Sequence, residues 1–183
     1  PELALSTKPL PAEIHVVCVP TPVRKRGEPD LSFIVKATDT IADIVSDGDV
    51  VVVESTVYPG VCRDVVMPIL IRTGKNVGVA HCPERINPGD KQWHVANIPR
   101  VLGADSAETA NKALNFYQAV IEADVTVLSQ LEAAEATKIL ENTFRDVNIA
   151  FINEMAKSFH VLGIDVSEVI RGADSKPFGF LKH

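Results

Sequence analysis

The chain has 183 residues, of which 46% are hydrophobic and 23% are charged, and its formal net charge is -6. This length and composition are sufficient for one sizeable hydrophobic core, or for one domain and part of another. The acidic balance argues against a nucleic-acid partner, and no apolar run reaches the ~18–20 residues of a membrane span. We therefore expect a protein that binds neither nucleic acid nor a membrane.

The cysteines are few and form no recognisable pair. Cys18, Cys62 and Cys82 include no CxxC motif, and an odd, sparse count is typical of a reducing compartment. Because no secretory signal opens the sequence, we expect a cytoplasmic protein, and we predict no metal site. The sequence begins at Pro1 without Met and ends at His183, so we expect both ends to be cuts in a longer protein.

Strand-length apolar runs alternate with helical patterns in the first part of the chain. Ile14–Val19 and Val50–Val53 are nearly continuous and β-branched, as expected for strands that are buried on both faces of a sheet. Weaker strand patterns cover 77–80, 100–103 and 125–128. Helical patterns cover 31–46, 60–73 and 106–122. Asp105 with Glu108 forms a predicted capping box for the last helix, and the alternation predicts a parallel α/β sheet.

The pattern changes near residue 124, where we place a domain boundary. Ser129 with Glu132 forms a second capping box, and a helical pattern then covers 130–162 without Pro or Gly. At 1.5 Å per residue this helix would measure roughly 50 Å, which indicates a spine that joins two domains or forms a dimer interface. Gly163 ends the pattern, and a short helix at 167–171 follows.

Polar or proline-rich stretches follow three of the predicted strands, where ligands bind in doubly wound sheets. These stretches are VPTP at 19–22, ESTVYPG at 54–60 and HCPERINPGD at 81–90. In the second stretch, Ser55 and Thr56 can exchange hydrogen bonds at the sheet edge, and the helix that follows offers its N-terminal N–H groups to an anion. The alternatives are a strand-ending turn for the first stretch and a helix N-cap for the second.

The third stretch and the long helix carry the charged candidates. A carboxylate in the third stretch would serve as a base or orient water, and Arg85 is a natural partner for a phosphate or carboxylate. On the long helix, Lys138, Asn142, Arg145 and Ile149 share one face at spacings of 4, 3 and 4. A Lys and an Asn that point together can stabilise a developing oxyanion, and the alternative is a solvated helix face with ordinary polar pairs.

Six motifs occur in a fixed order along the chain: VPTP, PDLS at 29–32, ESTVYPG, CPERINPGD, EAAEATKILENTFRDVNIAFINEMA at 132–156, and FLK at 180–182. This series resembles the UDP-glucose/GDP-mannose dehydrogenase family over nearly the whole chain. The PERINPGD and ENTFRDVNIA sequences are more similar to the branch that acts on UDP-N-acetylhexosamines, such as UDP-N-acetylglucosamine and UDP-N-acetylmannosamine, than to the UDP-glucose branch.

The resemblance implies a fold, a cofactor and a reaction. Residues 1–124 would be the C-terminal part of a Rossmann-like NAD-binding domain with a parallel sheet. Residues 125–183 would be a long connecting helix and part of an all-α central domain that forms a homodimer through the helix at 130–162. The family uses two molecules of NAD to oxidise the 6-hydroxymethyl group of a nucleotide sugar, here a UDP-sugar, to a carboxylate, for polysaccharide precursor synthesis. A cysteine holds the aldehyde as a thiohemiacetal, and water hydrolyses the resulting thioester.

The resemblance also implies roles for individual residues. Glu84 would assist thioester hydrolysis and Thr56 would hold the attacking water, while Lys138 and Asn142 would stabilise negative charge on the sugar oxygen. The residues that border the dinucleotide would be Pro20, Thr21, Ser55 and Thr56. The residues that bind the sugar and the nucleotide would be Arg85, Ile86, Asn87, Lys138, Asn142, Arg145, Phe180, Leu181 and Lys182.

Two features of the family do not occur in this sequence. There is no GxGxxG turn for the pyrophosphate, and the sequence stops before the GGxC stretch that carries the nucleophilic cysteine of the family. We therefore expect this chain to be inactive by itself. Two other interpretations stay open: a non-catalytic dimerisation or binding module based on the helix at 130–162, or a complete short enzyme in which Cys82, beside His81, is the nucleophile.

Overall fold

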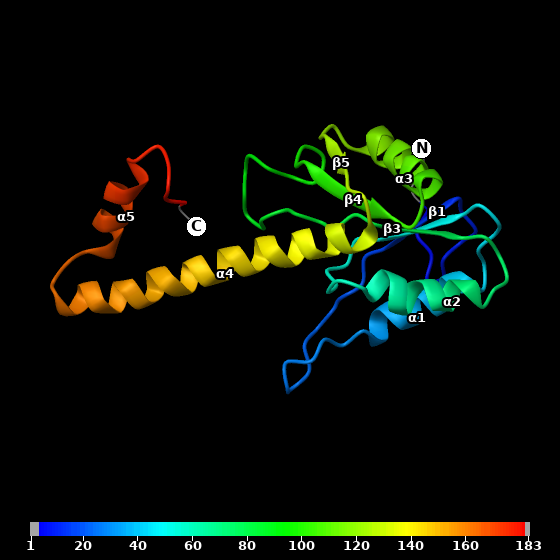
Figure 1. Cartoon of the computed structure of the whole chain (residues 1–183), viewed down its shortest axis with the longest axis horizontal. Helices are drawn as coiled ribbons and strands as arrows, with labels where there is room; N and C mark the ends of the chain where they lie inside the picture. Colours follow the sequence, from blue (N-terminus) through cyan, green and yellow to red (C-terminus); the bar gives the residue numbers. More distant parts are fainter. Residues whose placement is uncertain (1–3, 182–183) are drawn as a thin grey trace. The chain divides into compact units, whose positions relative to one another are not determined.

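The computed structural model of the chain describes residues 4–181 (Figure 1). It divides into two compact units, Pro1–Ile139 and Leu140–His183, which are described separately below. The domain boundary that we expect near residue 124 stays a prediction. The first unit holds a five-stranded sheet whose strands lie side by side in chain order: β1 (Ile14–Val17), β2 (Val50–Val53), β3 (Gly78–His81), β4 (Arg100–Ala104) and β5 (Val125–Val127). All five predicted strands are therefore present.

Helices cover both faces of this sheet (Figure 1). One face is covered by α1 (Ser32–Ala42), the π-helical turn η1 (Cys62–Val66) and its continuation α2 (Met67–Ile71), and the other by α3 (Ala107–Val120). This arrangement of helices on two faces of a mostly parallel sheet confirms the predicted α/β class with a Rossmann-like architecture.

The centre of the sheet explains why β2 is a run of four valines. Successive side chains in a strand point to opposite faces, so Val51 and Val53 enter the core under α1 and α2, while Val50 and Val52 enter the core under α3. All four are almost completely buried. The prediction that this strand is buried on both faces is confirmed.

Among the described residues, β1 is covered on one face only. Val17 is buried, but Val16 is 38% exposed and Cys18 is exposed. The reason is position: β1 is the edge strand of the sheet formed by the described residues, and α3 packs on β2, β3, β4 and β5. An apolar sequence is compatible with burial, but its place in the sheet decides how much of it is covered.

The direction of β4 also differs from a fully parallel sheet. β1, β2 and β3 are parallel, whereas β4 pairs antiparallel to β3 and β5 pairs parallel to β4. A parallel crossover usually contains a helix, and residues 82–99, which connect β3 to β4, contain none. As a result, the beginning of β4 lies at the same edge as the carboxyl ends of β1, β2 and β3.

Helix α3 forms as predicted, but its capping residue differs. Its N-cap is Ser106, whose hydroxyl accepts a hydrogen bond from the Thr109 N–H at 3.1 Å. The side chain of Asp105 instead accepts a hydrogen bond from the Val79 N–H at 2.9 Å. The predicted capping box of Asp105 with Glu108 is therefore wrong, because Asp105 anchors the strand end and not the helix.

The second unit is helical. It contains the greater part of α4 (Leu131–Val161), which begins in the first unit, and the short α5 (Val166–Asp174). The long helix predicted at 130–162 is thus confirmed, and Gly163, with a φ of 71°, follows its end. Asp165 caps α5 by accepting a hydrogen bond from the Ser167 N–H at 2.9 Å.

Candidate active site at the carboxyl edge of the sheet

Ser55 joins the end of β2 to the loop that follows β1. Its buried hydroxyl accepts a hydrogen bond from the Val19 N–H at 2.8 Å and donates to the Val19 carbonyl, which lies at 2.7 Å. Both bonds fix the loop that carries Pro20, which is exposed, and Thr21, which is half-buried. Because its hydroxyl is engaged in these bonds, Ser55 supports the predicted dinucleotide border through the loop backbone.

Thr56 and Glu84 leave the sheet at the same edge. The parallel register pairs Val53 of β2 with His81 of β3, and each of the two candidates lies three residues beyond one member of that pair. Both side chains are half-buried. The Glu84 carboxylate accepts a hydrogen bond from the Ile86 N–H, which holds the start of the loop in a turn.

Lys138 reaches this edge from α4. The residue is 9% exposed, and its ammonium donates a hydrogen bond to the backbone carbonyl of Glu84. The two residues are 54 positions apart in the sequence. The structure thus brings together two candidates that the sequence places on a loop and on a distant helix.

The first turns of α4 are packed tightly against the sheet. Leu131 and Ala134 are buried, and a Cβ atom at Gly103 in β4 would lie 2.5 Å from the Gln130 carbonyl oxygen. Only glycine permits this approach of α4 to the strand. Glu135, one helical turn after Leu131, is completely buried, and its carboxylate contacts the start of η1.

The Glu135 side chain lies at the amino end of η1, the helix that the sequence suggests would bind an anion. Its Oε2 accepts a hydrogen bond from the Gly60 N–H at 2.6 Å, and its Oε1 accepts one from the Cys62 N–H at 2.8 Å. These are the backbone groups that precede and begin η1. The expected anion-binding role of this helix end is therefore wrong, because a carboxylate of the chain itself already fills it.

A second buried network lies at the same edge. The Glu54 carboxylate accepts hydrogen bonds from the Arg100 guanidinium at 3.0 Å and from the Tyr117 hydroxyl at 2.7 Å. Arg100 is 3% exposed and lies 5.4 Å from the centre of the Tyr117 ring, in cation–π contact. This network ties the end of β2 to the start of β4 and to α3. Burial, followed by the charges of Cys82 and Glu54, raises the pKa of Tyr117.

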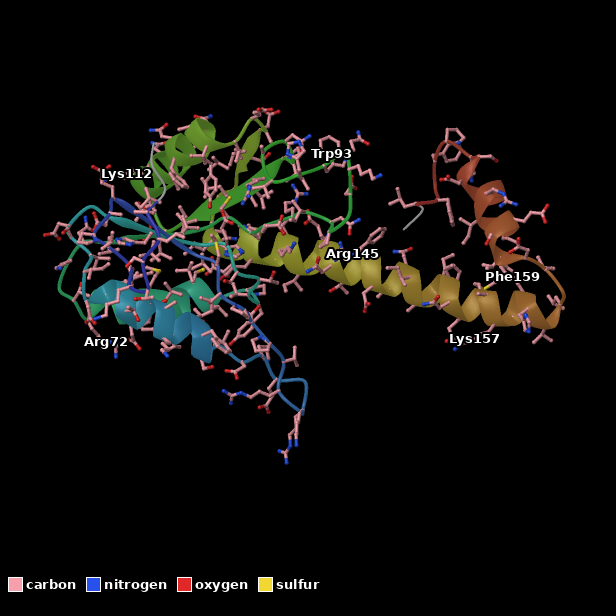
Figure 2. The ribbon with its side chains drawn as sticks, turned by 180° about the vertical axis from the view of Figure 1, so that it is seen from behind. Arg72, Trp93, Lys112, Arg145, Lys157 and Phe159 are labelled. Atoms are coloured by element: carbon pink, nitrogen blue, oxygen red, sulfur yellow. The ribbon has the colours of Figure 1, made fainter. Side chains whose placement is uncertain are left out.

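The remaining predicted residues of the loop after β3 lie near its start. Arg85 and Ile86 are half-buried and Asn87 is exposed. The Arg85 guanidinium donates a hydrogen bond to the Pro99 carbonyl at 2.8 Å, which connects the two ends of the loop. Farther along the loop, the Trp93 side chain is 42% exposed (Figure 2).

Within the second unit, two of the predicted site residues contact each other. Arg145 projects from α4 (Figure 2), and its guanidinium donates a hydrogen bond to the Asn142 side-chain oxygen at 3.2 Å. Phe180 and Leu181 border a cavity of about 140 Å³ together with Asn148 and other residues of α4 and α5. Lys182, also predicted to bind the nucleotide, lies outside the described residues.

The three cysteines lack the environment of a reactive thiolate. Partial desolvation of the thiol, with the neighbouring charge of Glu54, raises the pKa of Cys18 to about 11, and burial raises the pKa of Cys82 to about 11. Burial and the charge of Glu135 raise the pKa of Cys62 still further. A thiol with a pKa near 11 is almost entirely neutral near pH 7, so none of these is an activated nucleophile.

A Cys82–His81 pair is also excluded by geometry. His81 and Cys82 are successive residues at the end of a strand, so their side chains point to opposite faces of the sheet. Cys82 packs in the core under α3, and His81 is completely buried. Burial lowers the pKa of His81 to about 4, which keeps its ring neutral near pH 7. The interpretation of Cys82 as the nucleophile of a short enzyme therefore fails.

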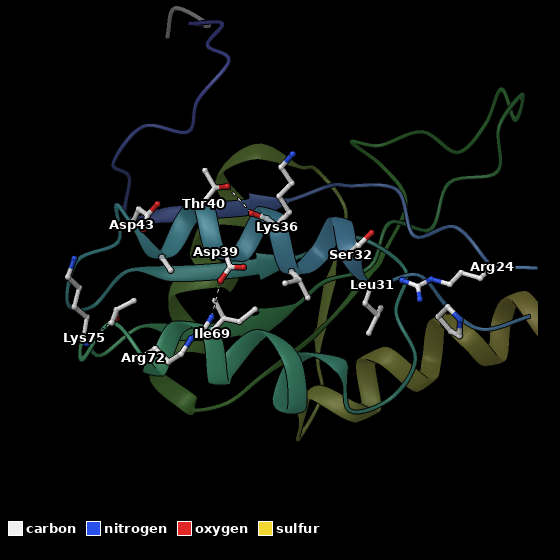
Figure 3. A pocket seen from close by; sticks show the side chains of 14 residues that line it. Arg24, Leu31, Ser32, Lys36, Asp39, Thr40, Asp43, Ile69, Arg72 and Lys75 are labelled. Carbon is white, nitrogen blue, oxygen red and sulfur yellow. Dashed lines mark hydrogen bonds and ion pairs between the residues drawn. The ribbon is translucent and has the colours of Figure 1, made fainter.

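A broad groove lies elsewhere, between α1 and α2 (Figure 3). Its volume is about 990 Å³, and an ion pair of 2.9 Å between Arg72 and Asp39 crosses it. None of the predicted site residues lines it.

Within residues 4–181 there is no cluster of three His, Cys, Asp or Glu side chains that would hold a metal ion. The described helices include none long and apolar enough to span a membrane.

Comparison with known proteins decides the family. The model of the NAD binding domain of the UDP-glucose/GDP-mannose dehydrogenase family matches residues 2–121, and the model of the family's central domain matches residues 132–183. The chain belongs to the UDP-glucose/GDP-mannose dehydrogenase family. This membership confirms the family that the sequence motifs indicate.

Individual relatives agree with the family. The chain is 40% identical over 167 residues to a UDP-N-acetyl-D-glucosamine 6-dehydrogenase of Salmonella typhi, an alignment that covers 88% of this chain and 39% of the relative. It is 36% identical over 178 residues to a UDP-N-acetyl-D-mannosamine dehydrogenase of Methanocaldococcus jannaschii, with 96% of this chain and 41% of the relative covered.

A solved structure agrees with the fold. The chain superposes on a UDP-D-ManNAc dehydrogenase of Pyrococcus horikoshii with a TM-score of 0.87 at 33% identity, covering 93% of this chain and 41% of that one. The chain thus spans about two fifths of the length of the relatives that it matches.

Sequence reasoning did not identify the buried carboxylates as part of the site. Glu135 follows Leu131 by four positions and precedes Lys138 by three, so it lies on the apolar stripe of α4. A charged residue on such a stripe indicates a buried partner, and this was the available signal. Glu54 and Arg100 gave no comparable signal, because their pairing depends on the antiparallel direction of β4.

Proposed function

We propose that the protein that contains this chain is an NAD-dependent dehydrogenase that oxidises the 6-hydroxymethyl group of a UDP-N-acetylhexosamine to the uronic acid, for polysaccharide precursor synthesis. The proposal rests on family membership and on the names of the relatives. The structural observation that carries it is the approach of Lys138 to Glu84, at the edge where Thr56 also leaves the sheet.

The residues at the carboxyl ends of β1 and β2 fit one border of an NAD site. Ser55 fixes the loop after β1, so that Pro20 and Thr21 stand at the sheet edge where dinucleotides bind in doubly wound folds. We assign Pro20, Thr21 and Thr56 to this border, with Ser55 as their support. When bound, NAD supplies the acceptor for the hydride that leaves the sugar carbon.

The polar residues of the chain then have distinct tasks. Lys138 places a cation where the oxygen on the reacting sugar carbon becomes negative, and Asn142 adds a hydrogen-bond donor. The Glu84 carboxylate orients the water that hydrolyses the thioester, and Thr56 holds that water. The side chains that bind the sugar and the nucleotide are Arg85, Ile86, Asn87, Arg145, Phe180 and Leu181.

The nucleophile of this reaction is not one of the three cysteines of the chain. Their pKa values are raised, and two of them are buried. The proposal therefore requires a cysteine from another region of the full-length protein, and the 183-residue chain is inactive by itself. The protein acts in the cytoplasm, which suits unpaired cysteines.

The test uses the full-length protein. Purified enzyme is incubated with NAD and, separately, with UDP-N-acetylglucosamine, UDP-N-acetylmannosamine or UDP-glucose, and NADH formation is measured. The proposal predicts that kcat/KM is highest with one of the N-acetylated sugars. Faster turnover of UDP-glucose would contradict the substrate assignment, and no turnover of any UDP-sugar would contradict the dehydrogenase function.

A homodimer through α4 is supported by a separate observation. Leu140, Phe144, Val147 and Phe151 are each between 47% and 70% exposed in the second unit. Their spacings of four, three and four residues place them in one stripe along the helix, as in helices that pair with another helix. Sedimentation equilibrium of the wild-type protein is expected to show a dimer, and Leu140→Glu with Val147→Glu is expected to weaken it. A wild-type monomer at high concentration would contradict this assignment.

A further inference from the structure

Glu135 connects α4 to the loop that carries Thr56. Each carboxylate oxygen accepts one backbone N–H, from Gly60 at 2.6 Å and from Cys62 at 2.8 Å. These distances are short, as expected for hydrogen bonds to an ionised acceptor. Both donors belong to the stretch that runs from Thr56 into η1. One buried carboxylate of α4 thus accepts two backbone N–H groups of the segment that follows β2.

The burial of Glu135 makes this contact specific. The residue is 0% exposed, and a carboxylate is buried at acceptable cost only where hydrogen bonds and positive partial charge compensate it. The two N–H groups and the amino end of η1 and α2 supply both. A shift of α4 along or around its axis would leave the buried charge without its partners, so the contact permits little displacement.

Lys138 lies one helical turn after Glu135, on the same side of α4. The carboxylate therefore fixes the place from which the lysine side chain reaches the Glu84 carbonyl. The close approach of Gly103 to the Gln130 carbonyl limits the helix from the sheet side. Together these contacts set the distance between the elements that carry Thr56, Glu84 and Lys138.

We infer that Glu135 is a positioning residue, whose buried carboxylate holds α4 against the start of η1 and thereby sets the position of the Lys138 ammonium. The inference rests on the proposed function for its catalytic consequence. The position of Lys138 is, however, measurable without any turnover.

The test compares Glu135→Gln with wild type in the full-length protein. Glutamine has nearly the same shape, but its NH₂ group cannot accept an N–H, so one of the two backbone donors loses its acceptor. We expect kcat to fall about 10- to 100-fold, as displacement of a catalytic group by about 1 Å does, with a smaller change in the KM for the sugar. Glu135→Asp retains the charge and is expected to give an intermediate kcat.

The second readout is the reactivity of the Lys138 amine. Native reductive methylation, quantified at each lysine by peptide mass spectrometry, should leave the 9% exposed Lys138 of the wild type largely unmodified. In Glu135→Gln we expect Lys138 to react several-fold faster. Lys157, exposed on the same helix, serves as the internal reference whose rate does not change.

Two variants separate positioning from loss of stability. Ser106→Ala removes the N-cap of α3, and Glu132→Gln removes an exposed ion pair with Arg63 beside Glu135. We expect both to leave kcat and the Lys138 labelling rate unchanged, even where Tm falls. If Ser106→Ala reproduced both effects at an equal loss of Tm, the role of Glu135 would be merely structural and the inference would be overturned.

Unchanged labelling of Lys138 in soluble Glu135→Gln would also overturn the inference, as would unchanged kcat. If Glu135→Gln does not fold, the same two measurements on Glu135→Asp decide, with wild-type values for both overturning the inference. If the wild-type protein oxidises no UDP-sugar, the proposed function fails by itself. The labelling rates then still decide whether Glu135 positions Lys138.

Discussion

The Lys138 ammonium of α4 donates a hydrogen bond to the backbone carbonyl of Glu84, in the loop that follows β3. This contact joins the sheet to the long helix at the edge where ligands bind in folds of this architecture. It also means that the lysine is held in place by the loop whose carboxylate is expected to orient water. The catalytic predictions below follow from this pairing.

Replacing Lys138 should remove the cation that stabilises the sugar oxygen. We expect Lys138→Met in the full-length protein to lower kcat about 100- to 1,000-fold, a typical effect of losing one group that stabilises an oxyanion. Lys157→Met, which removes an exposed lysine of the same helix, is the matched control and should retain wild-type kcat. Steady-state NADH formation measures both, and equal rates for the two variants would contradict the role of Lys138.

Replacing Glu84 should slow the hydrolytic step more than the first oxidation. In Glu84→Gln the water loses its carboxylate, so the covalent enzyme–sugar adduct should accumulate and kcat should fall about 100-fold or more. Intact-mass spectrometry after mixing with NAD and UDP-sugar detects the adduct. Glu108→Gln, on the exposed side of α3, is the control and should show neither change. Rapid turnover of Glu84→Gln without an adduct would exclude this role.

The Arg100–Glu54 pair should be important for stability. Arg100→Met leaves the Glu54 carboxylate without its cation in a largely buried place, and such losses cost about 3 kcal/mol or more. Urea unfolding measures the change in free energy. Arg72→Met breaks an exposed pair with Asp39 and should change stability little. Similar small effects for both variants would show that the Glu54 network is not a significant source of stability.

Replacement of two glycines by alanine should change the stability of the protein in opposite directions. Gly103→Ala places a Cβ 2.5 Å from the Gln130 carbonyl, so α4 must shift, and both Tm and kcat should fall. Gly172→Ala, in α5 with no atom within 4 Å of the new Cβ, should raise stability by about 0.5–1 kcal/mol. Thermal unfolding distinguishes them. An unchanged Tm for Gly103→Ala would contradict the close packing of α4 on β4.

Buried His81 should make the protein sensitive to mild acid. Its folded pKa is lowered to about 4 from 6.5, so the unfolded chain binds the proton more readily. This contribution to stability is fully present above pH ~6.5 and is lost as the pH falls towards ~4, up to about 3 kcal/mol. Urea unfolding of wild type and His81→Leu over this interval should show a shallower pH slope in the variant. Parallel slopes would contradict the prediction.

The regular elements were predictable because their signals are local. The four valines of β2 and the helix at 130–162 could be read from apolar periodicity and from the absence of Pro and Gly. The exposure of β1 and the antiparallel β4 could not be predicted in this way. The first depends on the place of the strand in the sheet, and the second on a connection without a helix.

The candidate site was predictable in part for the same reason. The motifs of the sequence point to Glu84 and Lys138, and the structure brings these two residues together. No motif points to Glu135, because its contacts are with the N–H groups of a segment more than 70 residues away. Ser55 is predicted to border the dinucleotide, and only the structure shows that its hydroxyl is bonded to the backbone of Val19. The roles of residues such as Glu135 and Ser55 can be assigned only when their tertiary contacts are known, because the residue types alone do not indicate them.

The stoichiometry of the oxidation tests the central proposal most directly. The full-length protein is given a limiting, known amount of UDP-N-acetylglucosamine or UDP-N-acetylmannosamine with excess NAD, and NADH and the sugar product are measured at completion. The proposed four-electron oxidation predicts two NADH for each sugar and a product that carries a 6-carboxylate. One NADH for each sugar with a free aldehyde as product, or no NADH at all, would contradict it.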